Sequence, residues 1–172
     1  MKILLILLFA IPLSLPAQTI SENKKDEFTG QHIKRTTYER FTSASKQRLW
    51  GNARISQIDS LIYLEIKLQL GGNIFGVSKG GKVMFKLKNG TILEVTSLSD
   101  ELSTIGGGAV DMLGSKNPGL HMQCLLTDTA ITLLKSSVPT KMRVYTTDGY
   151  AEADIKESFG EKISKMVTLI KE

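Results

Sequence analysis

The chain has 172 residues, of which 41% are hydrophobic and 23% are charged, and its formal net charge is +5. This composition suits one folded domain with a substantial core and excludes a highly charged disordered chain. The mildly basic charge also excludes a strongly cationic tail for binding polyanions. Because Cys124 is the only cysteine, no internal disulfide can form, and packing alone must stabilise the fold.

The N-terminus has the pattern of a secretory signal peptide. A single lysine precedes an apolar run from Ile3 to Ile11, and the small residue Ala17 follows. That run is too short to span a bilayer, although an uncleaved N-terminal anchor is the alternative interpretation. We expect cleavage after Ala17, which would release a chain that does not span the membrane into the periplasm or the medium.

The composition along the chain predicts three parts. We expect a signal peptide over residues 1–17, a flexible polar leader over residues 18–27, and a single β-rich domain over residues 28–172. At the start of that domain, the largely polar residues from Ile33 to Phe41 are β-prone and predict an edge or exposed strand.

Residues 82–98 carry the clearest β-hairpin signal. Hydrophobic and polar side chains alternate on both sides of Asn89-Gly90, and this period of two places one face of each strand in the core.

The turn of this hairpin is decided by the same alternation. A two-residue turn would place Phe85 opposite Glu94 and mix core with solvent. A three-residue loop over residues 88–90 gives consistent core pairs: Leu87 with Thr91, Phe85 with Leu93, and Val83 with Val95. We therefore predict a bulged turn with Gly90 in the left-handed conformation.

Residues 53–70 give the second strong strand signal. Every second residue from Ile62 to Leu70 is apolar, and the intervening residues form an exposed face: Tyr63, Glu65, Lys67 and Gln69. A turn at Asp59-Ser60 would pair Ile55 with Leu64 and Ala53 with Ile66. A helix is the competing interpretation, and strict alternation favours the strand.

The remaining elements are shorter. Strands are predicted at residues 74–77, 120–127, 141–147 and 150–153, and a long connection spans residues 99–119, where we expect a mobile lid. Asp128 is the expected N-cap of a short helix over residues 128–136. Apolar residues from Ile155 to Ile170 repeat at helical spacing and predict an amphipathic C-terminal helix with Asp154 as its N-cap.

Together these elements predict an α+β fold. We expect a predominantly antiparallel β-sheet, either curved or arranged as a sandwich, with a short helix near residues 128–136 and the amphipathic C-terminal helix.

Two glycine-rich segments have the spacing of nucleotide-binding loops. Residues 76–82 match a phosphate-binding loop, but Val83 replaces the Ser or Thr that would bind Mg²⁺, and a strand follows in place of a helix. Residues 106–108 lack the third glycine of the dinucleotide pattern. We therefore expect no nucleotide cofactor.

Three residues are candidates for nucleophilic catalysis: Cys124, His121 and His32. His121 and Cys124 are three apart in a predicted strand, so they point to opposite faces and cannot form a local dyad. Cys124 shares its face with Met122 and Leu126, which indicates an inert core thiol. A pairing of Cys124 with His32 stays open on the sequence.

Glu152 and Asp154 share a face of the last predicted strand, with Asp148 at the turn before it. Carboxylates on one side of a strand can hold Ca²⁺, but this spacing does not match an EF-hand loop. A solvated turn is the alternative, and we assign no metal-binding residue.

A basic face is predicted on one side of the central hairpin, with further cations nearby: Lys82, Lys86, Lys88, Lys34, Lys46, Arg48 and Arg54. Such a face can attract acidic glycans or lipid headgroups, although lysines also protect solvated sheets from edge-to-edge pairing. Nucleic acid is not expected as a partner of an exported protein. Five aromatic residues are candidates for a carbohydrate surface: Tyr38, Trp50, Tyr63, Tyr145 and Tyr150. Aromatic residues make up only 6% of the chain, however, and ordinary use in the core and at interfaces explains them.

Several segments together resemble small exported proteins of unknown function from Bacteroidetes. They are the signal peptide ending LPAQ, DEFTG near the mature start, KLKNGTILEV in the hairpin, and MRVYTTDGYAEADIKES before the terminal helix. The resemblance implies an envelope or secreted location and an antiparallel β-rich fold. It implies no activity, cofactor or functional residue.

The sequence therefore favours an exported non-enzymatic binding or interaction module of the cell envelope. Its expected partner is a small ligand, a glycan or an envelope protein, and we assign no catalytic or cofactor-binding residue. The alternative is a hydrolase-like or metal-assisted enzyme that gathers the 99–119 loop, a histidine and carboxylates. A structural subunit is the third hypothesis.

Overall fold

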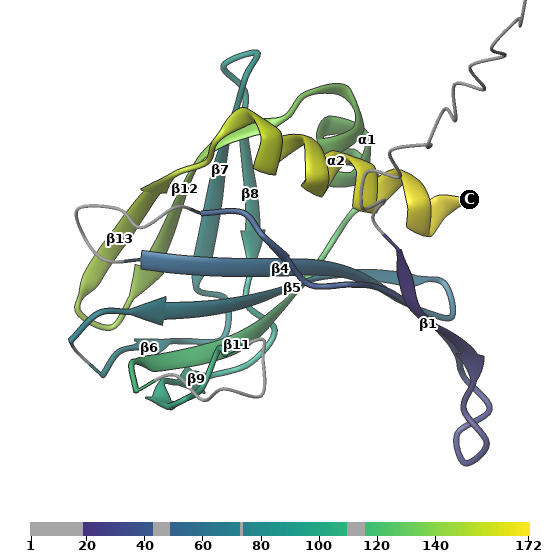
Figure 1. The fold of residues 1–172 in the computed structure, drawn as a ribbon, viewed down its shortest axis with the longest axis horizontal. Helices are drawn as coiled ribbons and strands as arrows, with labels where there is room; N and C mark the ends of the chain where they lie inside the picture. The colour runs from purple at the N-terminus through teal and green to yellow at the C-terminus, as the bar shows by residue number, and fades with distance from the viewer. Residues whose placement is uncertain (1–18, 43–48, 73, 110–115) are drawn as a thin grey trace, which may run out of the picture.

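The computed structural model describes residues 19–42, 49–72, 74–109 and 116–172. Within these ranges the chain forms thirteen strands and two helices, arranged as two antiparallel sheets and one short strand pair (Figure 1). The predicted α+β, mainly antiparallel fold is confirmed. The predicted signal peptide lies outside the described residues.

The larger sheet contains seven strands. Its order is β1 (Ile20–Lys25), β2 (His32–Thr36), β4 (Leu49–Ile58), β5 (Leu61–Leu70), β11 (Pro118–Leu125) and β10 (Thr104–Ile105), and β3 (Glu39–Arg40) also pairs with β4.

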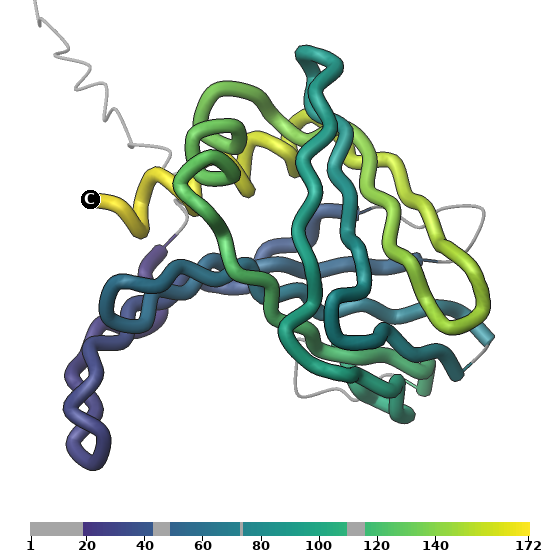
Figure 2. The backbone as a smooth tube through the Cα atoms, turned by 180° about the vertical axis from the view of Figure 1, so that it is seen from behind, coloured from purple at the N-terminus to yellow at the C-terminus, as the bar shows by residue number. Residues whose placement is uncertain are grey.

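The smaller sheet contains four strands, and a short pair lies beside it. Its order is β13 (Gly149–Asp154), β12 (Pro139–Thr146), β7 (Lys82–Leu87) and β8 (Ile92–Thr96), and β6 (Gly76–Val77) pairs with β9 (Glu101–Leu102). Figures 1 and 2 show the strands of the two sheets crossing steeply. A bridge between Ser97 and Cys124 joins the end of β8 to β11.

The core lies between the two sheets and under helix α2 (Glu157–Lys171). Inward side chains of β5, β7 and β12 are buried there, and so is the apolar stripe of α2: Ile163, Met166, Val167 and Ile170. The shorter helix α1 (Asp128–Ser136) forms over the predicted residues, packs beside α2 and buries Ile131 and Leu134. Fully burying one such side chain contributes about 1.5–3 kcal/mol before the cost in entropy.

The predicted central hairpin is confirmed in register and in turn type. Phe85 pairs with Leu93 and Val83 with Val95. The Leu87 N–H donates to the Thr91 carbonyl over 2.8 Å, and Gly90 has a φ of 88°. The second hairpin is also confirmed, because Ile55 pairs with Leu64 and Ala53 with Ile66.

The predicted caps of both helices were wrong. The N-cap of α1 is Thr127, one residue before Asp128, because the Thr127 hydroxyl accepts the hydrogen bond from the Ala130 N–H. Asp154 does not cap α2 but ends β13, where it pairs with Lys141, and α2 begins only at Glu157.

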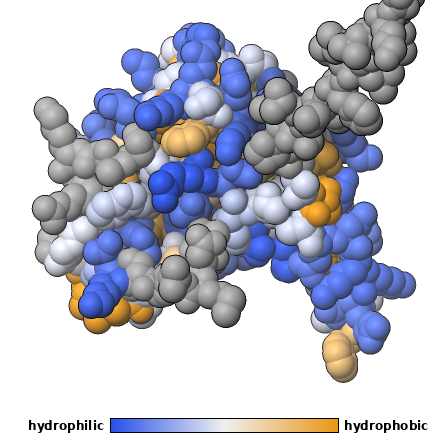
Figure 3. All heavy atoms as spheres, in the orientation of Figure 1, coloured by the Kyte–Doolittle hydropathy of each residue, from blue (hydrophilic) through white to orange (hydrophobic). Residues whose placement is uncertain are grey.

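The expected flexible leader is a strand in the structure. Residues 20–25 form β1 and pair with β2, so β2 is an inner strand. The segment for which an edge or exposed strand was predicted is divided between β2, whose side chains are mostly half-buried, and the short β3. The turn end of the β1–β2 hairpin projects beyond β4 and β5 as an arm (Figures 1 and 2), and its surface is mainly hydrophilic (Figure 3). At its turn the side chain of Phe28 is 98% exposed.

The predicted 99–119 connection contains regular structure. Strands β9 and β10 lie within it, and β11 begins at Pro118. Residues 110–115, in which the rest of the expected lid falls, are outside the described residues.

Candidate functional site

The most densely connected polar group lies on the outer face of the seven-stranded sheet and centres on Glu65. Alternation along β5 points Glu65 away from the core, directly opposite Arg54 on β4. The side chain is nevertheless only 1% exposed, because Tyr38, in the connection between β2 and β3, contacts it from above. Glu65 is thus a buried carboxylate on the face of the sheet that is directed away from the core.

Four donors converge on the Oε2 atom of Glu65. Arg54 approaches with Nη2 at 2.7 Å and Nε at 2.9 Å, the Tyr38 hydroxyl donates over 3.0 Å, and His121 Nε2 lies at 3.1 Å. The other oxygen, Oε1, accepts from the Ser56 hydroxyl. We call these five residues the Glu65 cluster.

Arg35 on β2 extends the cluster. Its Nε lies 3.8 Å from Glu65 Oε1, and its Nη1 donates to Glu22 on β1. Arg35 therefore links the root of the arm to the buried carboxylate.

The contacts set the protonation state of the two buried members. Burial by itself would raise the pKa of Glu65, but hydrogen bonds from His121, Ser56 and Arg54 outweigh it and hold that pKa well below its usual range. Burial, with the negative charge of Glu65, raises the pKa of Tyr38. Glu65 is therefore ionised and Tyr38 is a neutral donor at neutral pH.

The same contacts orient His121. Because the Tyr38 hydroxyl donates its proton to Glu65, its oxygen can accept from His121 Nε2, which lies 3.2 Å away. Nε2 thus carries a proton and faces two acceptors, the Tyr38 oxygen and Glu65 Oε2. The His121 side chain is 40% exposed, so solvent reaches the ring.

Lys67 lies beside the cluster and connects it to the 99–119 segment. Its Nζ is 4.6 Å from the centroid of the Tyr38 ring, and the Arg54 guanidinium is 4.5 Å from the same centroid. The Lys67 ammonium also donates to the Ala109 carbonyl over 3.0 Å. Burial and the nearby charge of Arg54 lower the pKa of Lys67.

The shifted pKa values of Glu65 and Tyr38 do not suit either group to acid–base catalysis. An acid or base catalyst works best with a pKa near the operating pH, whereas Glu65 and Tyr38 are both shifted away from neutrality. The ionised carboxylate instead holds Arg54, Tyr38 and His121 in one geometry. The result is a preorganised set of hydrogen-bond donors and cations at the sheet surface.

The three catalytic candidates do not come together. Cys124 is fully buried among core residues, and burial raises the pKa of its thiol to about 12. His32 is exposed at the root of the arm, and His121 faces the opposite side of β11 from Cys124, as predicted. The predicted inert thiol is therefore confirmed.

The acidic candidates on β13 contact cations of the neighbouring strand. Lys141 Nζ lies 3.6 Å from Asp154 and 4.0 Å from Glu152, and Arg143 also pairs with Glu152. Among the described residues, no group of three or more His, Cys, Asp or Glu side chains is placed to hold a metal ion.

The structure distributes the predicted basic face over several surfaces. Lys82 and Lys86 lie on the outer side of β7, as predicted, whereas Arg54 lies on the other sheet. Lys34 donates to carbonyls at the end of α2. Lys46 and Arg48 are outside the described residues.

The glycine-rich residues 76–82 lead directly into β7, as expected from the strand pattern. Their backbone therefore lacks the helix N-terminus that a phosphate-binding loop requires.

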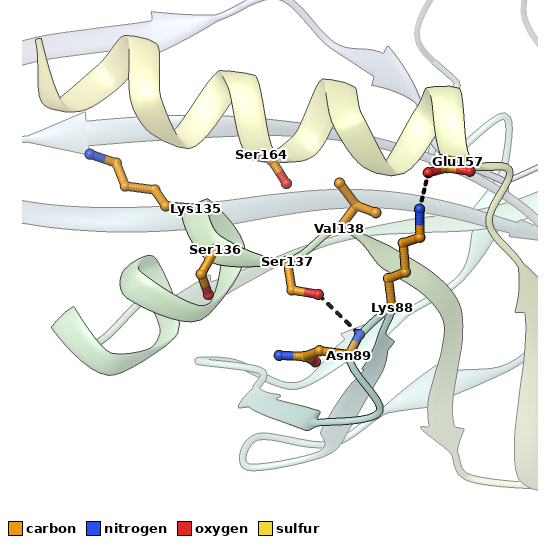
Figure 4. A pocket seen from close by; sticks show the side chains of 8 residues that line it. All are labelled: Lys88, Asn89, Lys135, Ser136, Ser137, Val138, Glu157 and Ser164. Atoms are coloured by element: carbon orange, nitrogen blue, oxygen red, sulfur yellow. Dashed lines mark hydrogen bonds and ion pairs between the residues drawn. The ribbon is translucent and has the colours of Figure 1, made fainter.

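Three cavities over the described part of the chain lie away from the Glu65 cluster. The one shown in Figure 4 has a volume of about 390 Å³ and lies between α1, the β7–β8 turn and α2. Lys88 Nζ bonds Glu157 across it over 2.6 Å, and the Asn89 N–H donates to the Ser137 hydroxyl over 3.2 Å. The other two measure about 300 and 210 Å³.

The alternation of residues 62–70 predicts Glu65 on a solvated face and gives no reason to single it out. One signal was available: the predicted Asp59-Ser60 turn sets Arg54 directly opposite Glu65, and opposite charges in such pairs attract. Nothing local indicated that Tyr38 and His121 would join them.

Comparison with models of known protein families, with curated proteins and with solved structures finds no match for this chain. Over the described residues, no helix has both the length and the apolar character needed to cross a membrane.

Proposed function

We propose that this chain is an exported, non-enzymatic binding module of the cell envelope. In this proposal the outer face around the Glu65 cluster binds an acidic group of the ligand, such as a carboxylate or phosphate. The acidic group can be carried by a small ligand, a glycan or an envelope protein.

The proposal rests on the observation that both carboxylate oxygens of Glu65 already accept hydrogen bonds from neighbouring side chains. Its two oxygens are occupied by Arg54, Tyr38, His121 and Ser56, so the carboxylate orders cations and does not itself react. Three cationic side chains, Arg35, Arg54 and Lys67, surround it against two carboxylates, Glu22 and Glu65. An anion placed beside Lys67 would offset this surplus of positive charge.

Calorimetric titration of the protein with inorganic phosphate and with D-glucuronate at low salt tests the proposal. We expect saturable binding of at least one of them that weakens as salt is added, is lost in Lys67→Ala and is retained in Lys67→Arg. Lys165→Ala is the matched control, because Lys165 is an exposed lysine of α2 and lies on neither sheet. No binding of either anion, or equal loss in both alanine variants, would contradict the proposal.

The exported location has a separate test. Cell fractionation should place the protein in the periplasm or the medium, and N-terminal sequencing of the purified protein should begin at Gln18. A cytoplasmic protein that retains Met1 would refute it.

The alternative function is a hydrolase-like enzyme at the same face. Two observations favour it: His121 lies 3.1 Å from Glu65, and Lys67 contacts Ala109 in the 99–119 segment. Hydrolysis of a chromogenic ester or phosphate that is lost in His121→Ala, with the fold retained, would replace the binding proposal.

A further inference from the structure

A second candidate surface lies on the outer face of the four-stranded sheet. Inward residues of β12 and β13 are buried, including Met142, Val144 and Ala151. The alternate residues point away from the core and form the outer face of these strands: Lys141, Arg143, Tyr145, Tyr150 and Glu152.

Two exposed tyrosines form one end of this face. Tyr145 and Tyr150 lie directly opposite each other on β12 and β13, with ring centroids 6.1 Å apart and ring planes at 53°. The Arg143 guanidinium lies 4.4 Å from the centroid of the Tyr150 ring. Arg143 thus covers part of the Tyr150 ring, and because Tyr150 is 52% exposed, the remaining aromatic surface is open to solvent.

A small cavity continues the surface next to the tyrosines. It has a volume of about 210 Å³ and is lined by six residues: Met84, Lys86, Ile92, Lys141, Arg143 and Glu152. The side chains of Met84 and Ile92 contribute aliphatic surface. Because drug-sized ligands occupy cavities of about 300–1,000 Å³, this one suits a smaller unit.

The polar groups around the cavity are held in ion pairs of both signs. Glu152 Oε1 pairs with Arg143 Nη2 at 2.5 Å, and Lys141 Nζ lies 3.6 Å from Asp154. Next to them on the same face, Lys82 pairs with Glu94 at 3.1 Å. Donors and acceptors are therefore present together in fixed positions on this face.

We propose that this face binds a saccharide chain, with one pyranose ring on Tyr150 and Tyr145 and the adjoining unit in the 210 Å³ cavity. A sugar ring has an apolar C–H face and a rim of hydroxyl groups that both donate and accept. The aromatic rings and the aliphatic floor match the first property, and the paired charges match the second.

The mixture of paired charges of both signs favours a saccharide over two other ligands, a polyanion and an apolar surface. A polyanion would be repelled by Glu152 and Asp154 although it would be attracted by the cations. A bilayer or an apolar protein surface would have to remove water from five charged groups: Lys86, Lys141, Arg143, Glu152 and Asp154. A neutral polyol can hydrogen-bond to both signs with little desolvation.

NMR or calorimetric titration of the protein purified after export, with soluble cello-, malto-, manno- and chito-oligosaccharides, tests the inference. We expect saturable binding of at least one series. Tyr150→Ala should weaken it at least tenfold, and Tyr150→Phe, which keeps the ring, should leave it within about threefold of wild type. Urea denaturation verifies that each variant is folded.

Matched variants on the other sheet separate this site from the acidic-group site. Tyr63→Ala and Lys67→Ala should leave saccharide binding unchanged, because both residues lie on the outer face of β5. Failure of every oligosaccharide to bind, or equal weakening in Tyr63→Ala and Tyr150→Ala, would overturn the inference. Neither result would bear on phosphate or glucuronate binding at Lys67.

Discussion

The carboxylate of Glu65 and the guanidinium of Arg54 lie opposite each other on β5 and β4, with Nη2 2.7 Å from Oε2. Among the described residues, no carboxylate other than Glu65 is contacted by two arginines, a histidine and a tyrosine. An ion pair whose carboxylate is buried is costly to break from one side, because the remaining charges lose their counter-ion without regaining full hydration.

Replacing Glu65 with glutamine should therefore destabilise the fold strongly. We expect Glu65→Gln to lower the free energy of unfolding by about 3 kcal/mol, because Arg54 and Arg35 keep their charges beside a neutral amide. Urea denaturation measures the loss. The control is Glu94→Gln, which removes a solvent-exposed pair with Lys82 and should cost less than about 1 kcal/mol. Similar losses in the two variants would contradict the structural role of Glu65.

The stability of the protein should also depend on Glu65 at acidic pH. Its pKa is lower in the folded protein than its ordinary value of 4.5, so as the pH falls the unfolded chain takes up the proton first. The contribution of Glu65 is then complete above that ordinary value and is lost as the pH falls toward the folded pKa. Thermal denaturation between neutral and acidic pH should show a steeper loss below about pH 4.5 in wild type than in Glu65→Gln. Parallel curves would show that this carboxyl is not shifted.

The thiol of Cys124 should be unreactive in the folded protein. It is fully buried, and burial raises its pKa to about 12 from an ordinary 9.0, which reduces the thiolate roughly a thousandfold near pH 8. Labelling with a chromogenic disulfide reagent should be at least about a hundredfold slower in buffer than in guanidinium chloride. Rapid labelling of the native protein would mean that this part of the core opens readily.

Helix α2 crosses β12 too closely for a side chain at Gly160. A Cβ atom there would lie 2.3 Å from the Pro139 carbonyl oxygen. Alanine normally favours a helix over glycine by about 1 kcal/mol, yet we expect Gly160→Ala to destabilise the protein by about 1–3 kcal/mol. Glu161→Ala, at an exposed position of the same helix, should change stability by less than about 0.5 kcal/mol. A Gly160→Ala protein more stable than wild type would show that the helix can shift away from Pro139.

Phenylalanines at opposite extremes of burial should respond differently to truncation. Phe85 is 2% exposed and packs edge-on against Phe41, so Phe85→Ala should cost about 3–5 kcal/mol. Phe28→Ala, at the tip of the arm, should change the free energy of unfolding by less than about 0.5 kcal/mol. Urea denaturation of both variants measures the contrast. A large loss in Phe28→Ala would mean that the arm folds back onto the body in solution.

The two main hairpins could be derived from local alternation, whereas the caps could not. Side-chain parity requires Phe85 to face Leu93 and Ile55 to face Leu64, and both pairs occur. Thr127 and Asp128 are both good N-caps, and the choice between them depends on where the chain leaves β11. Strand β1 was missed because its side chains are mostly polar, and the backbone pairing with β2 that forms the arm leaves no hydrophobic pattern.

By itself the sequence determined the registers of the two main hairpins, the bulged turn at Gly90 and the buried, inert Cys124, because period-two alternation and turn chemistry act over a few neighbouring residues. Only the tertiary structure decided that Glu65 is buried on an outward face. Tyr38 and His121 are 83 residues apart in the chain, and they meet only because β2, β4, β5 and β11 lie side by side in one sheet. The same holds for the cavity beside Tyr145 and Tyr150, which β7 and β8 complete from the other half of their sheet.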